Sequence, residues 1–303
     1  MGAPVVVLAG GTGGAKLARG MLDVAGSDLV VVANTGDDVE IYGAYVSPDP
    51  DLVTFWLADR IDERGWGLRD DTFHAMDGFR ELGVDVWFNL GDRDLAIGLQ
   101  RARRLAEGAR LTEALAELGA ALGLRARVLA MSDAPVRTWV FARGRWTAFQ
   151  EFMVRDGAEG PVDGVELRGI EAAAPTPEVL DAIAMAQAII VGPSNPVISI
   201  GPILAVPGMR DALRAAAAPV VAISPIVGGR VLKGPTAAFM AWAGQPLSAD
   251  GVAALYGDVL DGMVCDEEDA QSVRSLRIDT TMADAAARAR VAEQVLAFAR
   301  GLV

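Results

Sequence analysis

Short, strongly apolar runs alternate with amphipathic segments along this 303-residue chain. The runs, rich in β-branched residues, are Val5–Leu8, Leu29–Ala33, Arg127–Met131, Ala188–Val191 and Val220–Ile223. Such runs are typical of strands buried on both faces of a parallel sheet. Helical patterns separate them, so the sequence predicts an α/β fold with a doubly wound, mostly parallel sheet.

The rest of the pattern defines the domain organisation. Lys16–Leu22, Pro177–Gln187 and Asp284–Arg300 have helical periodicity, whereas Trp139–Phe152 alternates as a β-hairpin does,. We expect one domain over 1–303, with a largely helical insertion at approximately 52–125. No apolar run approaches the roughly 18 residues of a membrane span, so we expect no membrane association.

Charge and composition exclude several classes of function. The net charge of −13 argues against a general nucleic-acid binder, which needs a basic surface,. Cys265 is the only cysteine, which excludes an internal disulfide and a cysteine-based zinc site,. His74 is the only histidine and no nucleophile motif accompanies it,. The N-terminus shows no signal peptide, and we expect a cytoplasmic protein.

The first polar segment, Gly10–Lys16, is a glycine-rich turn between a strand and a helix. Glycines let the backbone approach a ligand, and a helix N-terminus offers N–H groups to an anion. Ala15 and Leu17 exclude a Walker A loop, and Lys16 replaces the last glycine of a dinucleotide fingerprint,. Anion binding is the expectation, and a tight turn without a ligand is the alternative.

Carboxylates gather after the second strand, in Asn34–Asp38 and Ser47–Asp51. We expect Asn34 to Asp51 to form a polar loop. Several carboxylates in one loop repel each other unless a cation joins them, and Mg²⁺ prefers one or two carboxylates plus substrate phosphates. Asp37, Asp38 and Asp51 are therefore the candidate Mg²⁺ ligands, with solvated turn residues as the alternative.

Four further polar segments follow apolar runs: Asn89–Asp94, Ser132–Asp133, Gly192–Pro196 and Ser224–Gly229. In open α/β sheets, ligands bind beyond the carboxyl ends of the strands. The segments are therefore candidates for one binding site, although each is also compatible with a simple turn. Lys233 is one of only two lysines and a candidate phosphate contact,.

These segments, in this order, resemble the 2-phospho-L-lactate transferase family of coenzyme F420 biosynthesis, whose bacterial members use a phosphoenolpyruvyl donor. The resemblance covers nearly the whole chain, and GPSNP and GDRD are its most specific motifs. The matching segments are GGTGGAKLARG (10–20), ANTGDD (33–38), SPDPD (47–51), LRDDTF (68–73), LGDRDLA (90–96), MSDAPVRT (131–138), IIVGPSNPVISIGPILAVPGMRDAL (189–213) and SPIVGGRVLKGP (224–235).

The resemblance implies a Rossmann-like core and a homodimer. It also implies that the ribityl hydroxyl of 7,8-didemethyl-8-hydroxy-5-deazariboflavin attacks a guanosine diphosphate-activated three-carbon acid, releasing GMP. Asp51 and Arg93 fall on the positions that contact the deazaflavin. We predict Asp51 and Asp37 as catalytic residues and Mg²⁺ as the cofactor. The predicted donor-binding residues are Gly11, Thr12, Gly13, Gly14, Asn34, Ser132, Asp133, Ser194, Asn195 and Lys233.

Two positions depart from the family pattern, and two other functions are compatible with the sequence. Ile97-Gly98 replace the family's usual Thr-His, and Ala134 replaces a carboxylate, so the acid carried by the donor stays open. One alternative is a non-catalytic nucleotide-sugar-binding regulator of the same superfamily, but Asp37 to Glu40 differs from the DDGGSSG-like segment of those proteins. A nicotinamide-dependent dehydrogenase is disfavoured by the imperfect glycine fingerprint.

Overall fold

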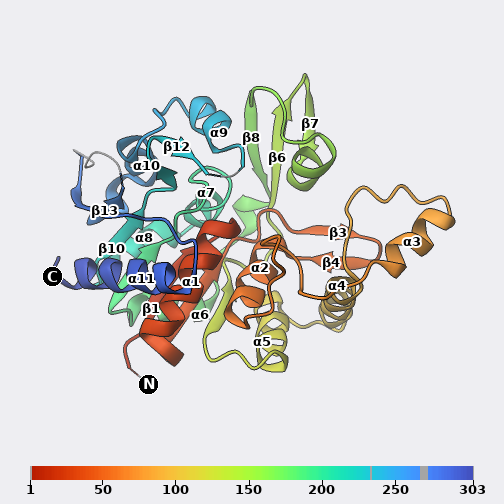
Figure 1. The fold of residues 1–303 in the computed structure, drawn as a ribbon, viewed down its shortest axis with the longest axis horizontal. Coiled ribbons are helices and arrows are strands. Elements are labelled where there is room, and N and C mark those ends of the chain that lie inside the picture. The colour runs from red at the N-terminus through yellow and green to blue at the C-terminus, as the bar shows by residue number, and fades with distance from the viewer. Residues whose placement is uncertain (1, 233, 267–271, 303) are drawn as a thin grey trace.

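A seven-stranded parallel sheet forms the core of the computed structural model, which describes residues 2–232, 234–266 and 272–302 (Figure 1). The strand order is β14-β13-β10-β9-β1-β2-β5. The strands are β1 (Val5–Ala9), β2 (Leu29–Ala33), β5 (Arg127–Ala130), β9 (Ala188–Val191), β10 (Val220–Ile223), β13 (Gly262–Cys265) and β14 (Arg274–Arg277). The five runs predicted as strands are confirmed, whereas β13 and β14 were not predicted.

The strand order places a ligand site at a definite point of the sheet. Read from β5, the first six strands follow the Rossmann order, and β14 extends the far edge,. The chain proceeds outward from β1 through β2 to β5, and then returns to the other side of β1 at β9. The order therefore reverses between β1 and β9, and such a reversal opens a crevice beyond the strand ends.

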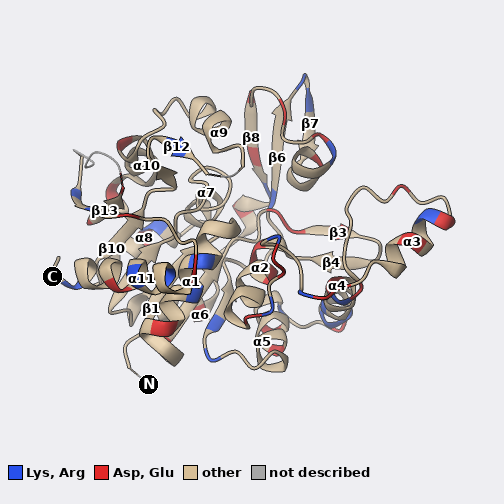
Figure 2. Ribbon diagram, viewed as in Figure 1, with Lys and Arg blue, Asp and Glu red and all other residues tan. Residues whose placement is uncertain are grey.

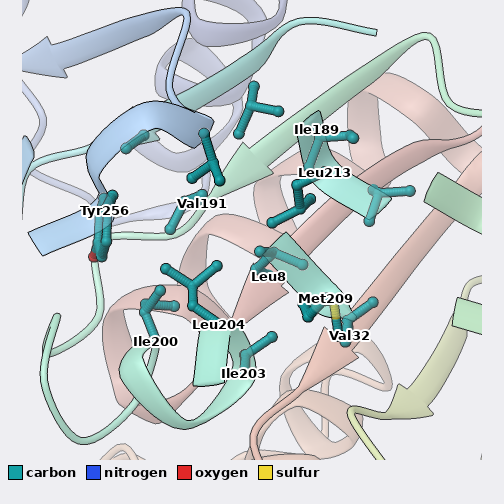
Figure 3. Packing of buried hydrophobic residues seen from close by; sticks show 14 of the residues in the cluster. Leu8, Val32, Ile189, Val191, Ile200, Ile203, Leu204, Met209, Leu213 and Tyr256 are labelled. Atoms are coloured by element: carbon teal, nitrogen blue, oxygen red, sulfur yellow. The ribbon is translucent and has the colours of Figure 1, made fainter. Parts of the chain in front are cut away.

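Alternate strand residues build two separate hydrophobic cores, one on each face of the sheet, as the doubly wound prediction requires,. Val5, Val7 and Ala9 pack against α1 (Gly11–Ala25), α2 (Pro48–Leu57) and α11 (Ala285–Arg300). Val6 and Leu8 face the opposite core, part of which Figure 3 shows. The helices of that core are α6 (Pro177–Ala184), α7 (Gly201–Ala205), α8 (Met209–Ala215), α9 (Thr236–Trp242) and α10 (Ala249–Tyr256).

Two insertions leave this core. Between β2 and β5 lie a hairpin, β3 (Val39–Ile41) and β4 (Ala44–Val46), then α2, α3 (His74–Glu81), α4 (Asp92–Ala106) and α5 (Leu111–Ala121). After β5, the predicted hairpin is confirmed as β6 (Arg137–Ala142) and β7 (Arg145–Ala148), and β8 (Gly164–Arg168) joins it. In Figure 1 this small sheet lies at the top and α3 at the right, far from the core.

A short hairpin, β11 (Ile226–Val227) and β12 (Arg230–Val231), precedes α9 (Thr236–Trp242).

Two polar segments predicted as loops are helical. The glycine segment begins α1 at Gly11, and Pro48 begins α2, so Asp49 and Asp51 belong to its first turn. The physical reason at α2 is that proline at the first helical position lacks an N–H that would have no acceptor there and has a backbone angle already suited to a helix. Among the described residues, no helix is long and apolar enough to cross a membrane.

Helices α3 and α4 cap each other at their N-termini. The Asp92 carboxylate accepts hydrogen bonds from the backbone N–H groups of His74 at 3.1 Å and Ala75 at 2.9 Å. The Asp71 carboxylate, just before α3, accepts from the N–H groups of Arg93 and Asp94 at 3.0 and 3.2 Å. These four N–H groups have no acceptor within their own helices, so the exchange fixes the segments around LRDDTF and GDRD against each other.

We predict that Asp71→Ala and Asp92→Ala each lower the free energy of unfolding and so the urea midpoint, because each leaves first-turn N–H groups without their acceptor. Urea unfolding followed by circular dichroism measures the change. Glu81→Ala, at the exposed end of α3, is the control and should leave the midpoint unchanged. Unchanged midpoints in both aspartate variants would contradict the reciprocal capping.

Candidate active site

At the reversal point of the sheet, the loops that follow β1 and β9 touch each other. The Gly10 N–H donates a hydrogen bond to Ser194 Oγ at 3.3 Å. A Cβ atom on Gly13 would lie 2.0 Å from the Pro193 carbonyl oxygen, and one on Gly14 would lie 2.7 Å from Ser194 Oγ. The loop after β9 packs directly on the first turn of α1. A side chain at Gly13 or Gly14 would collide with it. Thr12 is half-buried in the same turn.

The N-terminus of α1 is met by a carboxylate from α2. Gly10, at the N-cap position, is extended and has no side chain to cap the helix. Asp49 replaces that cap, because its Oδ1 accepts a hydrogen bond from the Gly11 N–H at 2.5 Å. In a helix that begins at Gly11, the N–H groups of Thr12 and Gly13 have no intrahelical acceptor. They remain available to a second anion at the same helix end.

Asn34, at the end of β2, joins two aspartates. Its Nδ2 donates to Asp37 Oδ1 at 3.2 Å and to Asp49 Oδ2 at 3.0 Å, and its Oδ1 accepts from the Gly36 N–H at 2.8 Å. Gln150 Nε2 donates to the other Asp37 oxygen at 3.2 Å. Asn34 is fully buried, and Asp37 and Asp49 are only 6% and 5% exposed. We call Asn34, Asp37 and Asp49 the carboxylate pair site.

No cation compensates this pair within salt-bridge distance among the described residues. Burial raises the pKa of Asp37 well above its ordinary value, and the negative charge of Asp49 raises it further. Burial likewise raises the pKa of Asp49 to about 6. Two buried carboxylates whose partners are all neutral amides and N–H groups form a site that a divalent cation would stabilise.

The chemistry of the site fits Mg²⁺ shared with a substrate. The described part of the chain contains no cluster of three or more aspartate, glutamate, histidine or cysteine side chains placed for a metal. Mg²⁺ commonly takes only one or two carboxylates from the protein and completes its shell with water and substrate phosphates. The carboxylate pair site can supply those two ligands, next to the free N–H groups of α1.

Asp38 adjoins the carboxylate pair site but has different partners. Its Oδ1 accepts a hydrogen bond from Ser47 Oγ at 2.7 Å, while its Oδ2 is buried and has no partner. Burial raises the pKa of Asp38 to about 7, although the hydrogen bond from Ser47 and the charges of Arg137 and Arg101 oppose the shift. Asp38 therefore adds a third buried acid to the region, and its charge further raises the pKa of Asp37.

Asp51 lies on the other side of α2 from Asp49. Positions two apart in an α-helix are about 200° apart around the axis, so the two carboxylates leave the first turn in opposite directions. Both oxygens of Asp51 accept hydrogen bonds from Arg101 of α4, one of them from Nη1 at 3.1 Å. The structure thus brings Asp37 together with Asp49 and places Asp51 with a buried arginine.

Arg93 occupies the first turn of α4, and its side chain is exposed. The next residue, Asp94, is largely buried beside Asp51 and Asp71, and its Oδ1 has no partner. Burial, followed by the charges of Asp51 and Asp71, raises the pKa of Asp94 to about 7. Asp51, Arg93 and Asp94 thus belong to a second acidic region at the start of α4. Figure 2 shows acidic segments just before β3, on α2 and near α4.

The remaining predicted residues hold loops in place. Ser132 Oγ accepts from the Ala134 N–H at 3.2 Å, and Asp133 caps α5 through the Thr112 N–H at 2.8 Å. Asn195 Oδ1 accepts from the Val197 N–H at 3.0 Å. Lys233 lies outside the described residues. These contacts show what shapes the loops at the sheet edge, and leave ligand contacts at Ser132, Asp133, Ser194 and Asn195 as predictions.

The structure adds two side chains that the sequence predictions omitted, Asp49 and Gln150. Asp49 stands in the recognised SPDPD segment, but a segment taken as a loop gives no reason to choose between its aspartates. The sequence does contain a helix-start signal, because a serine followed by proline begins many helices. In a helix, Asp49 and Asp51 point in different directions. Gln150 comes from the β6–β8 insertion, and nothing near it in the sequence indicates its contact with Asp37.

Comparison with known proteins identifies the family of the chain. The family model described as "2-phospho-L-lactate transferase CofD" matches residues 5–296. The 2-phospho-L-lactate transferase of Methanosarcina mazei is 39% identical over 267 residues, 88% of each chain. The phosphoenolpyruvate transferase of Kitasatospora aureofaciens is 40% identical over 312 residues, 97% of each chain.

A solved structure supports the fold alone. The crystal structure of a UPF0052-family protein from Bacillus halodurans superposes with a TM-score of 0.65 and 16% identity, covering 98% of this chain and 99% of that one. The match of the family model over almost the whole length, together with relatives near 40% identity, settles the family. This chain belongs to the 2-phospho-L-lactate transferase family.

Proposed function

We propose that the protein transfers a phospholactyl or phosphoenolpyruvyl group from a guanosine diphosphate-activated donor to the ribityl hydroxyl of 7,8-didemethyl-8-hydroxy-5-deazariboflavin. The products are GMP and F420-0 or its dehydro form. The observation that carries the proposal is the carboxylate pair site at the N-terminus of α1, at the reversal point of the sheet. Its relatives are named 2-phospho-L-lactate and phosphoenolpyruvate transferases.

The donor's diphosphate belongs at the N-terminus of α1. Thr12 and Gly13 contribute N–H groups there, and the helix dipole favours a negative ligand. Asp37 and Asp49 hold Mg²⁺, which when bound neutralises charge on the diphosphate. Asn34 and Gln150 fix the two carboxylates, and Ser194 and Asn195 shape the loop that faces the nucleotide.

The acceptor belongs at the second acidic region, with Arg93 and Asp51. Because both oxygens of Asp51 already accept from Arg101 and Asp51 leaves α2 on the side opposite Asp49, Asp51 acts by accepting a further hydrogen bond that binds the deazaflavin, while the terminal ribityl hydroxyl extends to the diphosphate at α1,. The hydroxyl oxygen bonds to the phosphorus that carries the acid, and the bond from that phosphorus to the GMP oxygen breaks. GMP leaves with that oxygen, and the hydroxyl proton is released to solvent. Arg93, exposed at the start of α4, is free to contact the deazaflavin.

The direct test is product formation from deazaflavin and a panel of guanylylated acids: phospholactate, phosphoenolpyruvate and phosphoglycerate. We expect GMP release and a new deazaflavin phosphodiester of the mass set by one of these acids. Binding should also perturb the visible absorbance of the deazaflavin. A protein that binds a nucleotide sugar but leaves deazaflavin absorbance and GMP unchanged would instead be a regulator.

We predict that Asp49→Asn lowers turnover by about 10²- to 10³-fold, because it removes a charge that holds the diphosphate's counter-cation. Asp37→Asn should have a similar effect. GMP release under saturating substrates measures both. Asp163→Asn, an exposed aspartate on the β6–β8 insertion, is the matched control and should keep wild-type turnover. Wild-type turnover in Asp49→Asn would remove the pair from the mechanism.

The affinity for Mg²⁺ should depend on pH in a defined direction. Protons and Mg²⁺ compete for the same oxygens, and the pKa of Asp49 is about 6,. Above that pH Asp49 is ionised, and any further rise in affinity reflects ionisation of Asp37, whose pKa burial also raises. Below it, the dissociation constant should rise by about tenfold or more per pH unit. Titration calorimetry with Mg²⁺ and GDP measures this, and a flat profile between pH 5 and pH 8, about one unit below and two above this pKa, would contradict the assignment.

A further inference from the structure

Arg101 is the arginine whose environment least resembles a surface site. Its side chain is 2% exposed, whereas the other described arginines in ion pairs have side chains 18% to 64% exposed. A buried guanidinium costs free energy unless ion pairs and hydrogen bonds compensate it. The Arg101 guanidinium lies in the interior, one helix away from the carboxylate pair site. It therefore needs specific partners that compensate its charge.

The partners of Arg101 come from two other elements, β4 and α2. Nη1 donates to the Tyr45 carbonyl oxygen of β4 at 2.9 Å and to Asp51 Oδ2 of α2 at 3.1 Å. Nη2 donates to Asp51 Oδ1. The planar fork of a guanidinium that binds both oxygens fixes the plane of the carboxylate as well as its position. The Tyr45 contact in turn fixes the guanidinium.

Asp51 still has an open side after this pairing. Its side chain is 14% exposed, and each carboxylate oxygen has more than one lone pair, so the fork does not exhaust its capacity to accept hydrogen bonds,. The charge of Asp51 is compensated, in contrast to the carboxylate pair site, where every hydrogen-bond donor is neutral. Two carboxylates of one helical turn thus have different properties.

We propose that Arg101 is a positioning residue for the acceptor: it holds the Asp51 carboxylate in the orientation that accepts a hydrogen bond from the acceptor. The inference rests on the proposed function, because it assigns Asp51 to the acceptor. It adds that a buried residue two turns along α4 from Arg93 determines acceptor binding without touching the acceptor. Donor and Mg²⁺ binding depend on the other side of α2, whose carboxylate pair site Arg101 does not contact.

The informative variant is Arg101→Lys, which keeps the charge but replaces the fork by a single ammonium group. We expect the KM and the dissociation constant for deazaflavin to rise by about tenfold or more, and the KM for the donor to stay within about twofold. Arg101→Met is a second variant, in which loss of the counter-charge can also unfold the protein, so urea unfolding is measured for both. Arg103→Lys, exposed on the same helix, is the matched control.

A double-mutant cycle distinguishes positioning from general support of the fold. In the Asp51→Asn background, Arg101→Lys should add less than about twofold to the deazaflavin dissociation constant, because the group that it orients is already altered. Full additivity of the two changes, or an equal loss of donor affinity, would overturn the inference. Wild-type protein that fails to bind deazaflavin would overturn the proposed function and this inference together. Tight binding by wild type and Arg101→Lys alike would overturn this inference alone.

Discussion

The first turn of α2 is the constraint on which the arrangement of the site depends. Pro48 starts the helix, so Asp49 and Asp51 leave it in opposite directions,. Asp49 reaches the N-terminus of α1 and shares Asn34 with Asp37. Asp51 reaches Arg101 of α4. If Asp49 and Asp51 lay in an extended loop, their side chains would not have these fixed directions. Asp49 would then not be held beside Asp37 while Asp51 is held beside Arg101.

The apparent conflict between a net charge of −13 and an anionic substrate is resolved locally. Asp49 occupies one N–H group of α1, so the helix end alone does not supply a strongly positive site. The same carboxylate, paired with Asp37, becomes an attractive site for a cation, and a cation there would attract phosphate. The acidity of the chain is thus compatible with the proposed diphosphate binding if a cation occupies the carboxylate pair site, and general binding of polyanions stays disfavoured.

Sequence patterns predicted the parts of the molecule whose structure is local. Runs such as Val5–Leu8 and Leu29–Ala33 became buried strands, and polar segments after them lie at one edge of the sheet. What could not be predicted depends on contacts distant in sequence: the Gln150–Asp37 contact spans 113 positions, and Asp51–Arg101 spans 50. The weak strands β13 and β14 were missed because Gly262 and the arginines of β14 do not read as a buried strand.

The carboxylate pair site also has a thermodynamic consequence. The pKa of Asp49 is raised in the folded protein, so the folded state binds its proton more tightly than the unfolded chain does,. The resulting stability is present at low pH and is lost as the pH rises toward about 6, which leaves the unliganded protein less stable at neutral pH. A divalent cation bound to the ionised pair would restore that stability. Because the buried pair has no counter-charge, its ionised form destabilises the unliganded protein. A bound cation would remove that penalty, so the site favours cations over other ligands.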